Sequence, residues 1–112
     1  GAKGYEVDQA ARSHLVSRGL PEITHATGHQ VGRFEHDGGT MFAPQWKRYG
    51  SAPFGTVEAG MIFTLEPTVL MEEGDYSVLC EEDILITEEG AEFISRRQDE
   101  LVLVQCPDGE RS

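Results

Sequence analysis

The helical part of this sequence is confined to its first residues, which limits the folds that a 112-residue chain can adopt. Residues 5–18, YEVDQAARSHLVSR, place apolar side chains at the three- and four-residue spacing of one helix face. These side chains are Val7, Ala11, Leu15 and Val16. Gly19 and Pro21 follow, at positions where helices commonly end. We therefore expect one N-terminal helix, with strands and loops after it.

The rest of the sequence has the composition of strands and loops. Strands are predicted at 61–71, 76–87, 91–95 and 100–105. A turn at 88–90 joins the second and third of them as a hairpin. Residues 22–36 are expected to be extended or looped, and residues 37–57, rich in Gly, Pro and aromatic residues, to form a long ordered loop. This order predicts an α+β domain in which the helix packs on a mainly antiparallel sheet.

The net charge of the chain is −11, from 20 acidic and 9 basic residues. This excess argues against a surface that binds nucleic acid or an anionic membrane, and it leaves carboxylates for a cation. No apolar run approaches the ~20 residues of a membrane span, and no signal peptide opens the chain. Cys80 and Cys106 form neither a disulfide framework nor a CxxC motif, so a reduced, cytoplasmic setting is expected. The length fits a single domain, residues 1–112.

Three of the four histidines lie close together in the sequence THATGHQVGRFEHDGG, at His25, His29 and His36. Its glycines and threonines favour an extended chain over a helix. His25 and His29 would then share a face, roughly 13 Å apart at the rise of a strand, and line one cleft without binding the same ion. The alternative is that these histidines are exposed, or hydrogen-bonded within the core.

Two acidic positions interrupt apolar strand patterns. Glu66 lies within GMIFTLEPTVLM, where burial of a carboxylate is costly unless it is paired or metal-bound. Pro67 cannot donate to a strand ladder, so an irregularity or a strand edge is expected there. The alternative is an exposed Glu66 on a solvent face. In the cluster Glu81, Glu82 and Asp83, at least one side chain must face inward, and alternation does not decide which.

One histidine with several carboxylates is a ligand set that suits Mn²⁺ or Fe²⁺ and tolerates Zn²⁺ or Co²⁺. A second histidine nearby would move protons near neutral pH, as hydrolysis requires. The residues alone therefore indicate metal-assisted hydrolysis as one function, and an acidic domain without a site as another.

The segments HATGHQVGRFEHD, GMIFTLEP and CEEDILITEEG, in this order, resemble the C-terminal half of the catalytic domain of the pita-bread metallopeptidases. This superfamily contains methionine aminopeptidases, prolidases and Xaa-Pro aminopeptidases. The similarity spans about residues 4–95, and the HDGG and WKRYG sequences favour the Xaa-Pro aminopeptidase branch. The resemblance implies a partial pita-bread fold and hydrolysis of the first peptide bond of a peptide substrate.

The resemblance also assigns roles to individual residues. It makes His29, Glu66 and Glu81 ligands of two divalent metal ions, with Mn²⁺ expected first and Co²⁺, Zn²⁺ or Fe²⁺ as alternatives. Glu81 would bridge both ions. It makes His36 and His25 substrate-binding residues that stabilise the oxyanion and move protons, and it gives Glu66 a part in proton transfer. His36, His25 and Glu66 are therefore the expected catalytic residues.

The chain also departs from the family pattern. Two aspartate ligands belong upstream of Gly4, so this sequence is expected to be a fragment that is inactive by itself and need not bind a metal. Gln30 and Thr68 stand where glycine is usual, and Leu79 stands where the Xaa-Pro branch often has arginine. The alternative function is that of a non-catalytic relative that binds a peptide or protein. An uncovered sheet edge would favour a homodimer, with the 61–71 region near the contact.

Overall fold

The computed structural model describes residues 1–107 and has one helix and seven strands, as predicted for an α+β domain. The elements are α1 (Gly4–Ser17), β1 (Gly28–Val31), β2 (Met41–Phe42), β3 (Ile62–Leu65), β4 (Thr68–Met71), β5 (Tyr76–Leu79), β6 (Glu82–Ile86) and β7 (Ala91–Phe93). Every strand pair is antiparallel. Strands β2-β1-β3-β6-β7 form one sheet and β4-β5 a separate ribbon. In the described residues, no helix is long and apolar enough to cross a membrane.

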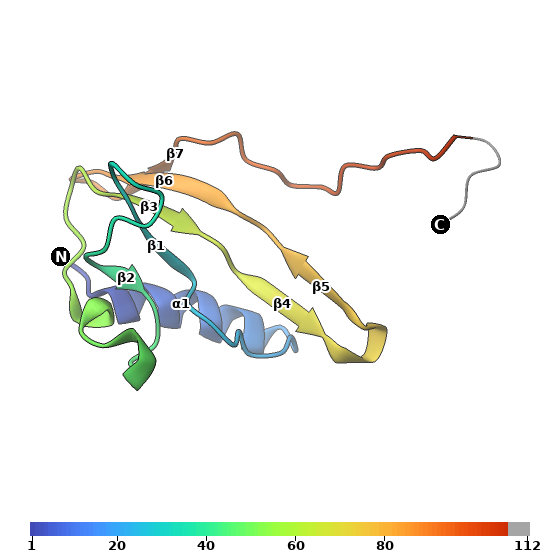
Figure 1. Cartoon of the computed structure of the whole chain (residues 1–112), viewed down its shortest axis with the longest axis horizontal. Coiled ribbons are helices and arrows are strands. Elements are labelled where there is room, and N and C mark those ends of the chain that lie inside the picture. The colour runs from blue at the N-terminus through green and yellow to red at the C-terminus, as the bar shows by residue number, and fades with distance from the viewer. Residues whose placement is uncertain (108–112) are drawn as a thin grey trace.

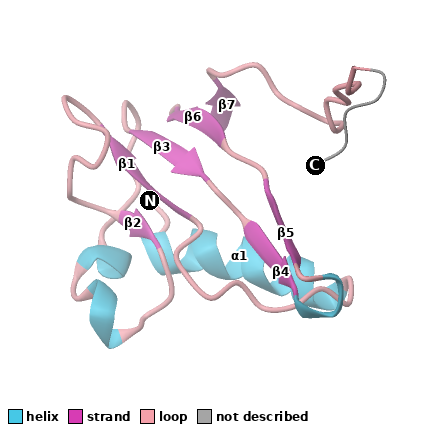
Figure 2. Ribbon diagram, turned by 45° about the vertical axis from the view of Figure 1, so that its right-hand side comes forward, coloured by secondary structure: helices cyan, strands magenta, loops and turns pink. Residues whose placement is uncertain are grey.

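Helix α1 lies below the sheet in the view of Figure 1, and the β4–β5 ribbon extends past the sheet over the C-terminal end of the helix. Figure 2 shows the same arrangement from a second direction. Stacked rings of Phe42 and Phe63, with centroids 4.1 Å apart, form the centre of the core together with Val57 and Ile84. Strands β1 and β3 approach closely because residue 28 is glycine. A Cβ atom at Gly28 would lie 1.9 Å from the carbonyl oxygen of Thr64.

The predicted apolar stripe of the helix is only partly buried. Val7 packs at the margin of the core, whereas Val16 is 49% exposed. The fully buried positions of α1 are Gly4, Asp8 and Arg12, which follow one another at four-residue spacing. The most deeply buried side chains of the helix are therefore the polar Asp8 and Arg12, which hydrophobic periodicity alone did not find.

Both long strands predicted from the sequence are interrupted. The 61–71 prediction corresponds to β3 and β4 with Glu66 and Pro67 between them, and the 76–87 prediction to β5 and β6 with Cys80 and Glu81 between them. The two interruptions face each other, because Leu65 pairs with Glu82 and Thr68 with Leu79. Pro67 has no N–H group for the ladder, which accounts for the change from sheet to ribbon at this point.

The remaining predictions have mixed outcomes. The β6–β7 hairpin is confirmed, but the strand predicted at 100–105 is wrong, since these residues form no strand and Leu101–Val104 are about 80% exposed. The 22–36 segment contains β1. The 37–57 loop contains β2 and two short 3₁₀ helices, η1 (Lys47–Tyr49) and η2 (Ala52–Phe54). A third 3₁₀ turn, η3 (Glu72–Gly74), joins β4 to β5.

Candidate metal centre

The break between sheet and ribbon determines where two predicted ligands lie. Glu66 follows β3 and Glu81 precedes β6, so both belong to the same gap between paired strands. The backbone N–H of Glu66 leaves the ladder and donates to the carbonyl oxygen of Thr27 at 2.6 Å. The hydroxyl of Thr68 donates to the carbonyl oxygen of Glu66 at 3.2 Å. These bonds satisfy the backbone around Pro67 and direct the Glu66 side chain toward β1.

His29 on β1 meets the Glu66 carboxylate. Its Nε2 atom lies 3.0 Å from Oε2 of Glu66, and its Nδ1 atom lies 3.2 Å from the carbonyl oxygen of Gln30. The Thr64 hydroxyl donates to the same Oε2 atom at 2.6 Å and accepts the backbone N–H of His29 at 3.1 Å. A proton on Nδ1 shared with the Gln30 carbonyl would leave the Nε2 lone pair for a metal, which is how second-sphere bonds orient ligand histidines.

Glu81 completes a pair of carboxyl groups. Its side chain shares a hydrogen bond with Glu66, and this bond, together with the charge of Glu66, raises the pKa of Glu81. Burial acts to raise the pKa of Glu66, but the hydrogen bonds from Thr64 and Glu81 and the nearby His29 and His36 outweigh it and lower that pKa. Two neighbouring carboxyl groups disfavour each other's ionisation, and a bound cation would relieve that repulsion.

His36 lies next to His29, with ring centroids 4.2 Å apart and ring planes 32° apart. It is carried by an exposed loop that Gln30 braces. The side-chain oxygen of Gln30 accepts the backbone N–H of Thr40 at 3.2 Å, and the residue before Thr40, Gly39, has a φ of 76°. The glutamine at position 30 therefore holds the base of the His36 loop.

His25 is not part of this cluster. It is half-buried, and its Nδ1 atom contacts the carbonyl oxygen of Ala26 at 2.7 Å. No interaction within the described residues joins its ring to the other predicted site residues. The structure thus brings together His29, His36, Glu66 and Glu81 and leaves His25 apart.

The cluster has the donor types of a divalent metal site, namely one imidazole nitrogen and two carboxyl groups. Among residues 1–107, no group of three or more His, Cys, Asp or Glu side chains is arranged to hold an ion. His29, Glu66 and Glu81 supply the donors of part of a metal site, and His29 and Glu66 are in direct contact.

Several residues that support this cluster were not identified from the sequence. Thr64 shares a strand face with Glu66, two residues on, and that alternation was an available signal. Asp8 and Arg12 are opposite charges four residues apart on a helix, which is also a readable pattern. Nothing in the sequence indicated that Gln30 braces a loop.

Solved structures of peptidases share this fold. The chain aligns with a dipeptidase from Pyrococcus horikoshii at a TM-score of 0.76 and 28% identity, over 93% of this chain and 27% of the other. The Xaa-Pro dipeptidase from Bacillus anthracis gives a TM-score of 0.76 at 30% identity with the same coverage. A methionine aminopeptidase from Rickettsia prowazekii gives 0.60 at 25% identity, over 83% of this chain and 43% of that one. The fold is that of the pita-bread metallopeptidases, represented here in part.

The family model of metallopeptidase family M24 matches residues 1–88, and the chain belongs to that family. The uncharacterised peptidase YqhT of Bacillus subtilis is 32% identical over 105 residues, which are 93% of this chain and 27% of that protein. An uncharacterised peptidase of Staphylococcus aureus is 32% identical over 91 residues, 80% of this chain and 23% of the relative. The chain thus spans about a quarter of the length of these relatives.

Proposed function

We propose that this protein acts in the metal-dependent hydrolysis of an N-terminal peptide bond, with a preference for Xaa-Pro sequences. The observation that carries the proposal is the contact between His29 and Glu66, joined by Glu81, in a chain of family M24. Relatives described as prolidases and Xaa-Pro dipeptidases support the substrate class. Mn²⁺ is the proposed metal, since one imidazole and several carboxylates suit it.

The Nε2 atom of His29 and the carboxylates of Glu66 and Glu81 would hold the metal, and divalent ions there would polarise the scissile carbonyl and acidify water. The lowered pKa of Glu66 favours its carboxylate form, which would accept a proton beside the metal. His36 lies against His29 on an exposed loop, where it would hold a proton and deliver it to the substrate. His25 would line the substrate pocket.

The test is a hydrolysis assay of the full gene product, stripped with a chelator and reloaded with Mn²⁺, Co²⁺ or Zn²⁺. Four peptides separate the possible activities. Ala-Pro tests dipeptidase activity, Ala-Pro-Ala tests Xaa-Pro aminopeptidase activity and Met-Ala-Ser tests methionine aminopeptidase activity, while Ala-Ala-Ala is the peptide without proline. Glu66→Gln and His29→Ala should lower kcat/KM by about a hundredfold or more, because each removes a ligand. Glu89→Gln, in an exposed turn, is the matched control and should leave kcat/KM unchanged.

Cleavage of Ala-Ala-Ala but not of the Pro peptides would contradict the Xaa-Pro preference. Metal-independent cleavage would contradict the proposal as a whole. Binding of these peptides without any hydrolysis would favour the non-catalytic alternative. The isolated 112-residue chain is expected to give no appreciable turnover, because the family pattern places two aspartate ligands outside it.

A further inference from the structure

Asp8 and Arg12 form an ion pair that is removed from solvent, with 0% and 4% of the two residues exposed. Nε of Arg12 donates to Oδ2 of Asp8 at 2.9 Å, and Nη2 donates to Oδ1 at 3.0 Å. A buried ion pair commonly stabilises a fold no better than apolar residues of the same volume. The burial of the pair therefore needs an explanation other than stability. The hydrogen bonds that the other donor and acceptor atoms of the two side chains make offer such an explanation.

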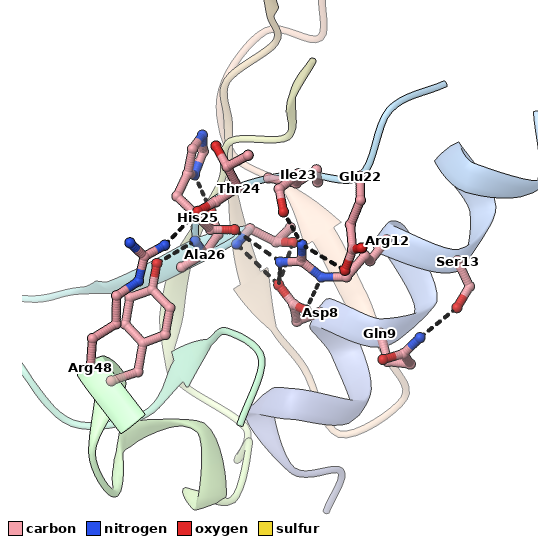
Figure 3. A network of polar contacts seen from close by, with 12 residues as sticks. Asp8, Gln9, Arg12, Ser13, Glu22, Ile23, Thr24, His25, Ala26 and Arg48 are labelled. Carbon is pink, nitrogen blue, oxygen red and sulfur yellow. Dashed lines mark hydrogen bonds and ion pairs between the residues drawn. The ribbon is translucent and has the colours of Figure 1, made fainter. Parts of the chain in front are cut away.

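These remaining atoms hold residues 23–27, a segment that forms neither helix nor strand. Arg12 donates to the carbonyl oxygen of Ile23 and, at 2.9 Å, to that of His25. Oδ1 of Asp8 accepts the backbone N–H of Thr27 at 3.2 Å and its hydroxyl at 2.7 Å. Figure 3 shows both side chains reaching from the helix to this segment, with the His25 ring on its opposite side.

The 3₁₀ helix η1 holds the same segment from a second side. The Tyr49 hydroxyl accepts the backbone N–H of Ala26 at 2.8 Å, and Arg48 donates to the carbonyl oxygen of Thr24. The Trp46 ring lies 5.2 Å from the Arg12 guanidinium and 5.0 Å from that of Arg48. Side chains thus bond one backbone group each of Ile23, Thr24, His25 and Ala26. Thr27 is held by Asp8 and also by the backbone, since its N–H donates to the carbonyl oxygen of Phe42 at 2.8 Å.

One hydrogen bond connects this arrangement to the candidate metal centre. The carbonyl oxygen of Thr27 accepts the backbone N–H of Glu66 at 2.6 Å, and Thr27 precedes His29 by two residues. A displacement of Thr27 would therefore move both members of the His29–Glu66 contact. The path runs from Asp8 through Thr27 to Glu66 without passing through the core.

We propose that Asp8 and Arg12 are positioning residues, which fix the backbone of residues 23–27 and thereby the placement of His25, His29 and Glu66. Neither residue touches the cluster itself. The pair holds a length of chain that is not itself a strand, at the point where it enters the sheet through the backbone bonds of Thr27. Any effect on hydrolysis rests on the proposed function, whereas the positioning of these groups does not.

Amide hydrogen exchange, measured residue by residue by NMR, tests the proposal. Asp8→Asn keeps the side-chain volume and removes the charge, and Arg12→Lys keeps the charge and removes the two-pronged geometry. Gln9→Ala is the matched control, because Gln9 makes an exposed side-chain bond to Ser13 at 2.7 Å on the same helix. The probes are the amides of Ala26, Thr27 and Glu66, and the amide of Ile86, bonded to Met61 at 2.8 Å, is the reference for global opening.

In Asp8→Asn and in Arg12→Lys, the amides of Ala26, Thr27 and Glu66 should exchange about tenfold or more faster than in the unaltered protein. The amide of Ile86 should exchange at an unchanged rate, because the segment would open locally without global unfolding. Equal acceleration at all four amides would show a general structural role and overturn the proposal, as would no acceleration. If Asp8→Asn does not fold, Arg12→Lys decides. In the unaltered protein the Arg12 Nε–H should exchange slowly, and rapid exchange of that group would also overturn the proposal.

The kinetics of the full gene product separate this proposal from the proposed function. Arg12→Lys should lower kcat more than it raises KM, because displaced reacting groups weaken the transition state selectively. Local exchange changes in a protein without peptidase activity would sustain the positioning role and reject the proposed function. Unchanged amide exchange in the variants of an active peptidase would reject the positioning role and leave the proposed function supported.

Discussion

Replacing Thr64 with valine removes a single hydroxyl that serves two members of the candidate metal centre. The hydroxyl donates to Oε2 of Glu66 at 2.6 Å and accepts the backbone N–H of His29 at 3.1 Å. Thr64 is 6% exposed, so water cannot readily replace either bond. Valine has nearly the same shape, and the substitution therefore isolates the hydrogen bonds from packing.

The expected loss follows from these two bonds. The bond to the backbone N–H contributes about 1 kcal/mol, and the bond to the partly exposed Glu66 carboxylate about the same after discounting for solvent. We therefore expect the free energy of unfolding to fall by about 2 kcal/mol at pH 7. With an unfolding entropy of about 0.24 kcal/mol/K for 112 residues, Tm should fall by about 8 °C.

Urea denaturation followed by circular dichroism at several pH values measures this loss. Glu66 has a folded-state pKa below its ordinary value of 4.5, so the stability it contributes is present above pH 4.5 and lost as pH falls through the folded pKa. Because Thr64 lowers that pKa, the difference between Thr64→Val and the parent should roughly halve in acid. Thr87→Val, half-buried and without a side-chain hydrogen bond in the described residues, is the control.

A loss below about 0.5 kcal/mol at pH 7 would show that the Thr64 bonds contribute no more than an ordinary surface contact, which would refute the reasoning. An unchanged loss between pH 7 and pH 3 would refute the part that involves the carboxylate. A double-mutant cycle with Glu66→Gln should recover about 1 kcal/mol of coupling, since the two side chains are in direct contact.

Gly28→Ala should lower the free energy of unfolding by about 3 kcal/mol or more, because its Cβ would lie 1.9 Å from a backbone oxygen of β3. Gly38→Ala, at a φ of 77° in open space, should lower it by only about 1–2 kcal/mol. Equal losses of the two variants in thermal denaturation would contradict the close approach of β1 and β3. Glu81→Gln should raise the Tm of the metal-free protein above pH 4.5. The pKa of Glu81 is raised by its bond to Glu66 and by the charge of that residue, so the stability that the protonated carboxyl contributes is lost as pH rises. The same variant should reduce the rise in Tm that Mn²⁺ produces, and an undiminished rise would argue against Glu81 as a ligand. We also expect a homodimer through the β4–β5 ribbon, which lines an apolar cavity of 340 Å³ with the end of α1, and sedimentation at 12.4 kDa over micromolar concentrations would reject it.

The sequence predicted much of the fold because its patterns are local. The periodicity of residues 5–18 and the turn at 88–90 are set by neighbouring residues, and both elements are present in the structure. The 100–105 strand was wrong for the complementary reason. A short apolar run forms a strand only where a partner edge is available, and Leu101–Val104 lie exposed without one.

The residues of the candidate site were readable from the sequence as motifs, but their geometry was not. Glu66 beside Pro67 predicted an irregular strand, whereas the alignment of that irregularity with Glu81 depends on the register of β3 with β6. Register is a long-range property, and it placed the two carboxyl groups together. His25 precedes β1 in a segment that is not a strand, so the shared face that its spacing from His29 suggested does not arise.

Residue types and their order therefore determined the family, the donor set and the single helix, since these depend on chemistry and on near neighbours. Only the tertiary structure decided which polar groups satisfy one another. The buried face of α1 is the clearest case, because an apolar stripe predicts burial by hydrophobicity, yet Asp8 and Arg12 occupy the interior. Their burial is tolerated because Ile23, His25 and Thr27, in the segment that follows the helix, supply further hydrogen-bond partners for both side chains.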